Sequence, residues 1–395
     1  MYSSVKTGLR SQYITLLLIA VAATLTVRAV LHFNGVAFHL KYEIPPARSR
    51  TPNEKPVFNE TLLKYAAIEL AEDRVKQEVE DLLDGNFGNR GQKRSFLSFG
   101  RYHIDLRLKS SRGSPLNLQS PEFNRLWLTL KKYLSDWWGN RRLNLDSMLD
   151  FANDAKLAIE EYSGIKGSRK KYKSCAVVGN SGILLRSDHG KLIDSHEIVI
   201  RLNNAGTVGY ERNVGAKTSV SFINSNILHS CARSVDCFCH PYGEKVPIVM
   251  YICQPVHFFD FLVCNSSHKA PLVVTDPRFD MLCARIVKYY SLKRFVETNR
   301  KDCGQWSSAR DGLEFHYSSG MQAIMLAVGT CEKVSVFGFG KSDSARHHYH
   351  TNQKAELSLH DYEAEYDLYE DLMKRPEAIP FISDEFNFPS FEIYH

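Results

Sequence analysis

The stretch that decides the fold is Cys175–Gly182 (CAVVGNSG), four apolar residues that run directly into a polar turn containing glycine. A short, continuous apolar run bounded by a turn is typical of a buried strand. Gly179 and Gly182 permit a tight turn and close approach of a ligand, while Asn180 and Ser181 offer hydrogen-bonding groups. The run does not match the G-x-G-x-x-G fingerprint of dinucleotide sites, and a purely structural turn is an equally good interpretation.

Five further apolar runs of this kind follow along the chain, and helix-length segments separate several of them, notably Arg278–Tyr290 and Gly320–Val328. Near-continuous apolar strands that alternate with helices are typical of a parallel sheet covered on both faces. The sequence therefore predicts an α/β fold with a doubly wound, mostly parallel sheet. The six expected strands are Cys175–Val178, Glu197–Arg201, Ser219–Ile223, Pro247–Ile252, Pro271–Thr275 and Val334–Phe337.

Polar clusters follow these expected strands, at the edge where doubly wound sheets bind their ligands. One cluster is Arg201–Ala205 (RLNNA), which contains Asn203. Another is Tyr317–Gly320 (YSSG), which opens an apolar helix at Met321. Hydroxyl and backbone N–H groups at a helix N-terminus suit an anion such as phosphate, although an ordinary helix cap would look the same.

Histidines gather after the last expected strand, in His347–His350 (HHYH) and at His360, with Glu365 close behind. Histidines are common zinc ligands, but the spacing does not match H-E-x-x-H, and no D-x-D pair for a nucleotide-bound divalent ion occurs in the chain. Imidazoles can instead hold a phosphate when protonated or accept a hydroxyl proton when neutral. The histidines alone leave these interpretations open.

The composition excludes several classes of protein. The chain has 395 residues, of which 44% are hydrophobic and 24% charged, so it is neither a disordered chain, a collagen-like repeat nor a disulfide miniprotein. Its 50 Lys and Arg against 44 Asp and Glu give a formal charge of +6, too small an excess to indicate a nucleic-acid partner. Nine cysteines is an odd number, so at least one stays unpaired within the chain.

The N-terminus contains a membrane-anchor candidate. Tyr13–Val27 carries no charge, and Ala29–Leu31 extends the run beyond Arg28 to about the 20 residues that span a bilayer. We expect residues 1–11 to be a cytoplasmic tail and 12–32 a transmembrane signal anchor, with a cleaved signal peptide as the alternative.

The segment after the anchor is rich in Pro, Gly, Arg and Ser, apart from a polar helix-like stretch near Leu62–Leu83, so we expect a luminal stem over residues 33–95 and a luminal catalytic domain over 96–395. Residues 122–138 have helical apolar spacing and predict a helix packed on that domain. All nine cysteines lie from Cys175 onward, where an oxidising lumen would let some of them pair. Glycosylation sequons at Asn59 and Asn265 fit the same side of the membrane.

Taken together, the clusters resemble the sialyltransferase family (glycosyltransferase family 29) of Golgi enzymes, and specifically its plant sialyltransferase-like branch. Four family motifs occur in the family's order. The long motif corresponds to Cys175–Gly182, Arg201–Ala205 and Gly215–Thr218, the short motif to Ser318–Gly320, Cys331 and Gly338–Gly340, the third motif to His347–His350, and the very short motif to His360 and Glu365.

The resemblance implies a Rossmann-type, GT-A-like domain that transfers a sugar with inversion and without a metal. By similarity, Asn180, Ser181 and Asn203 would contact the nucleotide of a CMP-sugar, and Ser318, Ser319 and Gly320 its cytidine or phosphate. His348 and Tyr349 would stabilise the leaving phosphate, and His360 would be the general base. Glu365 would orient a helix or backbone group, and Cys175 and Cys331 would form the disulfide of the family.

The resemblance also implies the partners: a nucleotide sugar, a glycan or glycoprotein acceptor and the Golgi membrane, with the chain a single-pass type II protein whose catalytic domain is luminal. The short motif reads Tyr317-Ser-Ser-Gly where animal members carry Pro-Ser-Thr-Gly, and the third ends in His350, where an acid or an aromatic is common. These departures leave the donor sugar open.

Three functional hypotheses follow from the sequence. The first is sialic acid transfer from a CMP-sugar to a galactose-ended glycan. The second is β-galactosyl transfer to arabinogalactan or other cell-wall glycans on the same fold. The third is a non-catalytic Golgi protein that organises other glycosyltransferases.

Overall fold

The computed structural model describes residues 58–84, 121–143, 146–165, 170–231, 240–299, 302–310, 312, 315–340, 342, 345–351 and 359–395. The expected cytoplasmic tail and transmembrane anchor lie outside the described residues. No helix within the described ranges is long and apolar enough to cross a membrane.

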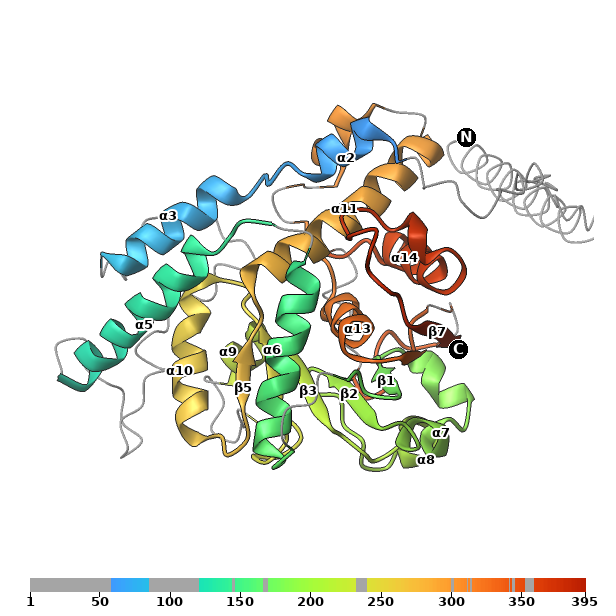
Figure 1. Ribbon diagram of the computed structural model, residues 1–395, viewed down its shortest axis with the longest axis horizontal. Coiled ribbons are helices and arrows are strands. Elements are labelled where there is room, and N and C mark those ends of the chain that lie inside the picture. The colour runs from blue at the N-terminus through green and yellow to red at the C-terminus, as the bar shows by residue number, and fades with distance from the viewer. Residues whose placement is uncertain are drawn as a thin grey trace, which may run out of the picture. The chain divides into compact units, whose positions relative to one another are not determined.

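Seven strands form one sheet in the order β5-β4-β3-β2-β1-β6-β7, and every neighbouring pair is parallel (Figure 1). The chain builds outward from β1 to β5 and then returns to add β6 on the other side of β1. This confirms the predicted doubly wound parallel sheet. The strands are β1 (Cys175–Val178), β2 (Ile198–Leu202), β3 (Val220–Asn224), β4 (Ile248–Tyr251), β5 (Leu272–Val274), β6 (Lys333–Phe337) and β7 (Ser390–Tyr394).

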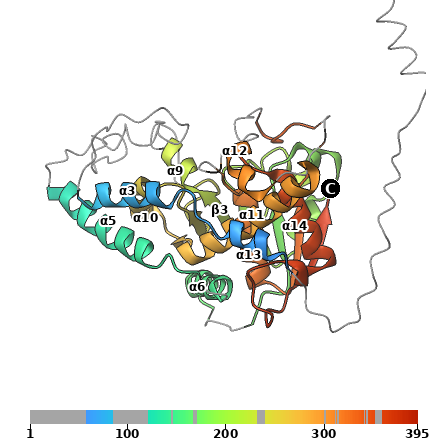
Figure 2. The same ribbon diagram turned by 90° about the horizontal axis from the view of Figure 1, so that it is seen from above.

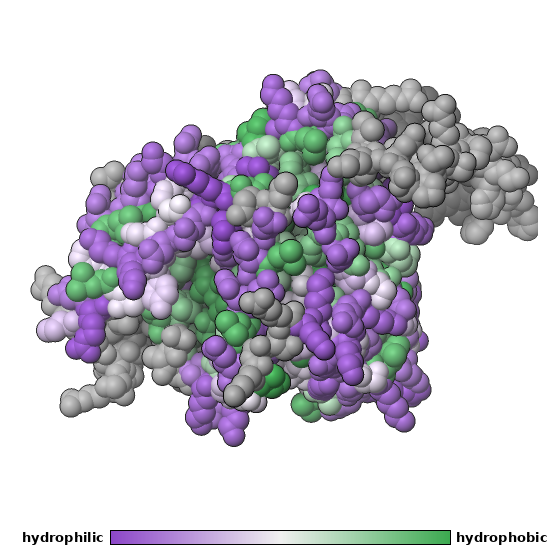
Figure 3. All heavy atoms as spheres, in the orientation of Figure 1, coloured by the Kyte–Doolittle hydropathy of each residue, from purple (hydrophilic) through white to green (hydrophobic). Residues whose placement is uncertain are grey.

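The central strands are mostly apolar because both faces of the sheet are buried. In β1, Cys175 and Val177 join one core, while Ala176 and Val178 join the core on the opposite face. Alternate side chains of a strand point to opposite faces, so each strand contributes to both cores. Hydrophilic residues cover most of the outer face in Figure 3, and the hydrophobic residues between them gather in separate patches.

Helices cover both faces of the sheet. Residues of α6, α11, α13 and α14 join the core that includes Cys175 and Val177, while α5 and α10 pack with one another beside β3 and β4. The helices are α2 (Glu60–Ala66), α3 (Glu72–Leu83), α5 (Pro121–Gly139), α6 (Ser147–Tyr162), α7 (Gly190–Asp194), α8 (Glu211–Val214), α9 (Ser225–Cys231), α10 (Phe258–Ser267), α11 (Pro277–Asn299), α12 (Trp306–Ala309), α13 (Ser319–Thr330) and α14 (Tyr362–Lys374), with short 3₁₀ turns at Gly182–Arg186, Pro255–His257, Cys303–Gln305 and Pro376–Ala378.

Part of the segment expected to be stem forms helices that pack on this body. Leu62 and Ala66 of α2 are buried in the main core, where α2 contacts α11. α3 lies beside α5 in both views (Figures 1 and 2), and Trp127 Nε1 of α5 donates to Leu82 O of α3 at 3.1 Å. The body therefore includes residues from before position 95.

The edge strand β7 is absent from the sequence prediction. It pairs with β6 along Ser390–Tyr394, but Phe391 is its only buried residue, and Glu392 pairs with Lys333 across the two strands at 2.9 Å. A strand that alternates polar and apolar residues at a sheet edge lacks the continuous apolar run that marks the central strands.

Candidate active site

A cleft of about 510 Å³ opens at the carboxyl edge of the sheet. Its walls come from the residues that follow β1, β2 and β6, from the end of β3, and from the first residues of α13 and α14. It therefore lies where the strand order reverses, between β1 and β6, which is the usual ligand position in doubly wound sheets.

The cleft brings together most of the residues that the sequence predicted for the site. They lie far apart along the chain, and the fold places them around one cavity. The predicted residues that line it are Asn180, Ser181, Asn203, Ser318, Ser319, Gly320, His348, His360 and Glu365.

The turn after β1 is locked to the loop that follows β6. The Ser181 hydroxyl donates to Gly340 O at 2.9 Å, and Gly182 N–H donates to Arg346 O at 2.9 Å. A Cβ at Gly182 would lie 2.5 Å from that same Arg346 oxygen, so only glycine fits there. Tyr349 N–H closes the contact by donating to Asn180 O at 2.8 Å. Ser181 thus joins the two loops. A ligand that bonds to the Ser181 hydroxyl would share that group with Gly340 O.

Asn203 follows β2 in a left-handed conformation, with φ of 51°. Asn is one of the few residues other than glycine that adopts this conformation readily. Its Oδ1 accepts from the backbone N–H of Asn224 at 3.1 Å, which fixes the side-chain amide at the end of β3.

Ser318 caps the N-terminus of α13, and the carboxylate of Glu365 in α14 accepts two hydrogen bonds from it. The Ser318 hydroxyl accepts from Met321 N–H at 3.1 Å and donates to Glu365 Oε2 at 2.6 Å, while Ser318 N–H donates to Glu365 Oε1 at 2.7 Å. Burial raises the pKa of Glu365, and its hydrogen bonds with Ser318 and Tyr369 oppose that rise. The hydroxyl of Ser318 is thus bonded within the protein, and Ser319 and Gly320, which line the cleft, supply the first-turn N–H groups that a helix N-terminus offers to an anion.

His360 lies beside His316, to which it is joined by an isolated parallel bridge. His360 Nδ1 is 2.9 Å from His316 O. A carbonyl can only accept, so this contact places the proton of neutral His360 on Nδ1 and leaves Nε2 as an acceptor. Burial, and then the nearby His360 and Arg74, lower the pKa of His316 to about 4, so His316 is uncharged at neutral pH. An imidazole with a free acceptor nitrogen is the form that a general base requires.

His348 belongs to a stack of imidazoles in the loop after β6. Its ring centroid lies 4.4 Å from that of His347 and 5.5 Å from that of His350, with nearly parallel planes. His347, which belongs to the predicted third motif but was given no role, also lines the cleft. Protonated imidazoles in such a stack can hold a phosphate.

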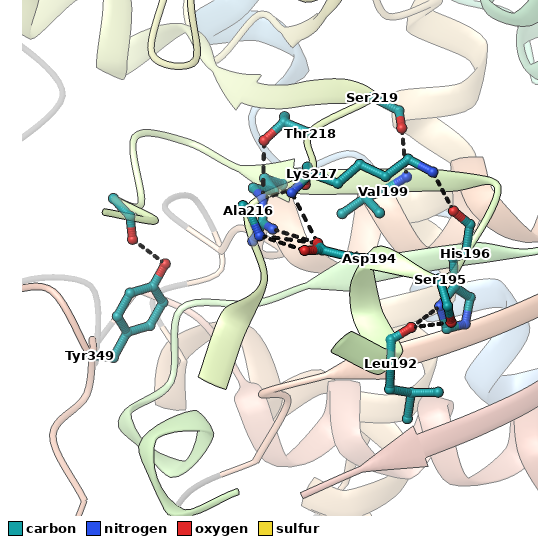
Figure 4. A network of polar contacts seen from close by, with 12 residues as sticks. Leu192, Asp194, Ser195, His196, Val199, Ala216, Lys217, Thr218, Ser219 and Tyr349 are labelled. Carbon is teal, nitrogen blue, oxygen red and sulfur yellow. Dashed lines mark hydrogen bonds and ion pairs between the residues drawn. The ribbon is translucent and has the colours of Figure 1, made fainter. Parts of the chain in front are cut away.

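Tyr349 does not line the cleft, which argues against its predicted contact with the leaving phosphate. Its side chain is only 1% exposed, and its hydroxyl donates to Gly206 O at 2.8 Å (Figure 4). Its ring packs against Tyr210 with centroids 5.0 Å apart. Burial raises the pKa of the phenol to about 12, so it remains protonated and holds the loop after β2 in place.

The last part of the long motif supports the sheet and lies outside the cleft. Asp194 accepts from Ala216 N–H at 2.9 Å and from Lys217 N–H at 3.0 Å, and Arg201 Nε donates to Lys217 O at 3.0 Å (Figure 4). Gly215 has φ of 72°, and a Cβ there would lie 2.3 Å from Asp194 Oδ1. These contacts fix the segment that enters β3 and so the position at which β3 ends.

The remaining predicted residues lie outside the cleft. Cys175 and Cys331 form a disulfide with their Cα atoms 6.0 Å apart, which ties the start of β1 to the end of α13. Asn59 is exposed and caps α2, and Asn265 lies in α10. Within the described ranges, no group of three or more His, Cys, Asp or Glu side chains is arranged to hold a metal ion.

Sequence reasoning missed several residues of the cleft. Asn224, Asn226, Tyr251 and His316 all line it, yet none belongs to a motif that the chemistry singled out. The available signals were positional: Asn224 directly follows the expected strand Ser219–Ile223, and His316 precedes the Tyr317–Gly320 cluster.

Comparisons with known proteins define the class. The family model described as glycosyltransferase family 29 (sialyltransferase) matches residues 128–376. The chain is 50% identical to the beta-1,6-galactosyltransferase GALT29A of Arabidopsis thaliana, over 99% of this chain and 100% of that one. It is 45% identical to sialyltransferase-like protein 1 of Oryza sativa subsp. japonica, over 96% of this chain and 97% of that one. A crystal structure of a mammalian sialyltransferase aligns with a TM-score of 0.36 at 17% identity, covering 76% of this chain and 95% of that one.

The chain is therefore a glycosyltransferase. More narrowly, it belongs to glycosyltransferase family 29, as the four sequence motifs indicated.

Proposed function

We propose that the chain transfers galactose from a nucleotide sugar to a hydroxyl of a galactose-containing glycan, such as a cell-wall arabinogalactan, with inversion at the anomeric carbon. The observation that carries the chemistry is the contact of His360 Nδ1 with His316 O, which leaves Nε2 as the acceptor nitrogen of a residue that lines the cleft. The choice of galactose is supported by the 50% identity to a beta-1,6-galactosyltransferase over essentially the whole of both chains.

In the proposed reaction, His360 Nε2 removes the proton of the acceptor hydroxyl as its oxygen attacks the anomeric carbon of the donor. The bond from that carbon to the phosphate oxygen breaks, and the nucleotide leaves with the electron pair. Charge develops on the leaving phosphate, and the N–H groups of Ser319 and Gly320, together with His347 and His348, are the groups that would hold it. The proton ends on His360 and passes to solvent after release.

The site has its own donors for the departing phosphate, so we propose that transfer needs no metal. The test compares initial rates in EDTA and after addition of Mn²⁺ or Mg²⁺. Equal rates support the proposal, and a rate that depends on the added ion overturns it.

A second candidate is sialic acid transfer from CMP-sialic acid to a galactose-ended glycan. It is favoured by the family description and by the motif order around Asn180, Asn203 and Ser319. The cleft chemistry serves both reactions, since each is an inverting displacement of a nucleotide at an anomeric carbon. A panel of UDP-galactose, CMP-sialic acid and CMP-Kdo, each with a galactan and a galactosylated glycan acceptor, separates the two candidates.

We also propose that the chain is a type II Golgi membrane protein with the catalytic domain in the lumen. The uncharged run Tyr13–Val27, within residues 12–32, and the sequons at Asn59 and Asn265 support this. Endoglycosidase sensitivity of the full-length protein and protection of its C-terminus from protease in sealed Golgi vesicles test it; an unglycosylated chain cleaved in intact vesicles would contradict it.

A further inference from the structure

Asn224 lies at the junction of three elements of the cleft. It ends β3, its backbone N–H donates to Asn203 Oδ1 at 3.1 Å, and its side-chain Nδ2 donates to Ser319 Oγ at 3.1 Å. The residue thus joins the turn after β2 to the first turn of α13, and all three side chains line the cleft.

These two bonds determine which groups Asn203 and Ser319 have left for a ligand. Asn203 already accepts through Oδ1, so its Nδ2 remains as a donor. Ser319 already accepts from Asn224, so its own hydroxyl proton is directed elsewhere. Both neighbours therefore present hydrogen-bond donors, which suits the phosphate, ribose and carbonyl oxygens of a nucleotide.

The side chain of Asn224 also carries a buried acceptor. Its Oδ1 is inaccessible to solvent and has no hydrogen-bond partner among the described residues. Buried polar atoms are seldom left unpaired, and when they are, the arrangement usually has a functional reason. The amide is held with Nδ2 toward Ser319 even though this leaves Oδ1 unpaired.

We propose that Asn224 is a positioning residue for the nucleotide donor: its side-chain amide turns the Ser319 hydroxyl so that it donates into the cleft, while its backbone N–H holds Asn203 Oδ1 and leaves Asn203 Nδ2 to donate there as well. This inference rests on the proposed function, because it assumes that a nucleotide occupies the cleft. It goes beyond that function by assigning the direction of the hydrogen bonds in the donor site to a residue outside the family motifs.

The sharpest variant is N224D, which keeps the size and shape of the side chain. A carboxylate cannot donate, so the Ser319 hydroxyl would turn to donate to it and would be lost to the nucleotide. N226D places the same charge two residues further along the same wall and measures the effect of charge alone. N224S removes the amide with a smaller side chain and serves if N224D does not fold, which thermal unfolding reports.

The experiment measures binding of UDP, UMP and CMP to the full-length protein by calorimetry, and donor and acceptor KM in the transfer assay. We expect N224D and N224S to weaken binding of the cognate nucleotide and raise donor KM by roughly three- to tenfold, beyond any effect of N226D, with acceptor KM unchanged. In an S319A background, N224D or N224S should raise donor KM by less than about a further twofold, because the changes at positions 224 and 319 act through the same Ser319 hydroxyl.

If the fold-changes in donor KM and nucleotide affinity caused by N224D and by S319A multiply fully in the double variant, the inference is overturned. A fall in kcat with unchanged donor KM would overturn it as well. Either result leaves the proposed function intact. Wild-type protein that binds none of the three nucleotides would instead overturn the proposed function, and the inference with it.

Discussion

Glu365 holds Ser318 by both of its polar atoms, with Oε1 2.7 Å from the backbone nitrogen and Oε2 2.6 Å from the hydroxyl oxygen. The carboxylate is buried and comes from α14, whereas Ser318 begins α13. A negative charge at a helix N-terminus is favourable, and here it also sets where the first turn of α13 lies relative to α14. The donor side of the cleft therefore depends on a residue that need not touch the ligand.

The first prediction concerns the two hydrogen bonds from Ser318 to Glu365. In Glu365→Gln, one of the two Ser318 contacts loses its acceptor because an amide has a single oxygen. We expect the free energy of unfolding to fall by about 1–3 kcal/mol and donor KM to rise, since both Ser319 and Gly320 shift with the cap. Chemical denaturation and steady-state kinetics measure these effects. Unchanged stability together with unchanged donor KM would contradict the assigned role.

The second prediction concerns the general base. His360→Asn should lower the rate of transfer by about 10²–10⁴-fold, because the acceptor hydroxyl loses its proton acceptor. The matched control is His196→Asn. His196 has its Nδ1 at the same 2.9 Å from a backbone carbonyl, that of Leu192, but lies outside the cleft (Figure 4). A comparable loss of transfer rate in both variants would show that the loss comes from breaking a structural hydrogen bond and not from removing the general base. A cellular phenotype retained by folded His360→Asn protein would favour the non-catalytic organiser.

The third prediction concerns pH. Burial raises the pKa of Asp280 to about 8, against hydrogen bonds from Thr275 and Gln322 that lower it. The folded protein therefore keeps a proton there that the unfolded chain releases near pH 4, so this stabilisation is lost as pH rises from about 4 to 8. Asp280→Asn should become more stable relative to wild type across that range, by roughly 1 kcal/mol per pH unit.

Denaturation curves at pH 5, 6.5 and 8 measure this difference. Asp136→Asn, at an exposed position of α5, is the control and should leave the pH dependence of stability unchanged. A difference between Asp280→Asn and wild type that is constant with pH would show that Asp280 does not hold a proton in the folded state.

The fourth prediction concerns the disulfide. Cys175 and Cys331 are fully buried and lie 156 positions apart in the chain. We expect the C175A/C331A variant to unfold with about 2–5 kcal/mol less free energy than wild type. Dithiothreitol should destabilise the wild type by more than it destabilises the double variant, in which Cys264 is still disulfide-bonded. Equal sensitivity of the two proteins to the reductant would mean that another bond is responsible.

The central strands could be predicted from the sequence because a parallel strand buried on both faces reads as a mostly apolar run, as Cys175–Val178 does. β7 could not, because an edge strand needs only one apolar side. The polar clusters could be located because the carboxyl ends of parallel strands meet at one edge, whereas the individual residues and their roles came from the resemblance to the family.

Tyr349 and Asn224 show what the sequence could not resolve. The loop after β6 bends at residues 347–350, so His348 lines the cleft while its neighbour Tyr349 packs in the core, and the sequence does not fix these directions. The place of Asn224 depends on contacts with Asn203 and Ser319, which lie 21 and 95 positions away and meet it only in the folded chain.

The measurement that tests the central claim most directly is transfer of labelled sugar by the full-length protein in EDTA, with the donor panel, in wild type, His360→Asn and His196→Asn. The account predicts a β-linked galactosyl product on the galactan with UDP-galactose, undiminished by EDTA, retained in His196→Asn and lost in His360→Asn. Transfer of sialic acid alone would replace the first candidate by the second. No transfer from any donor, or transfer that persists in His360→Asn, would contradict the account.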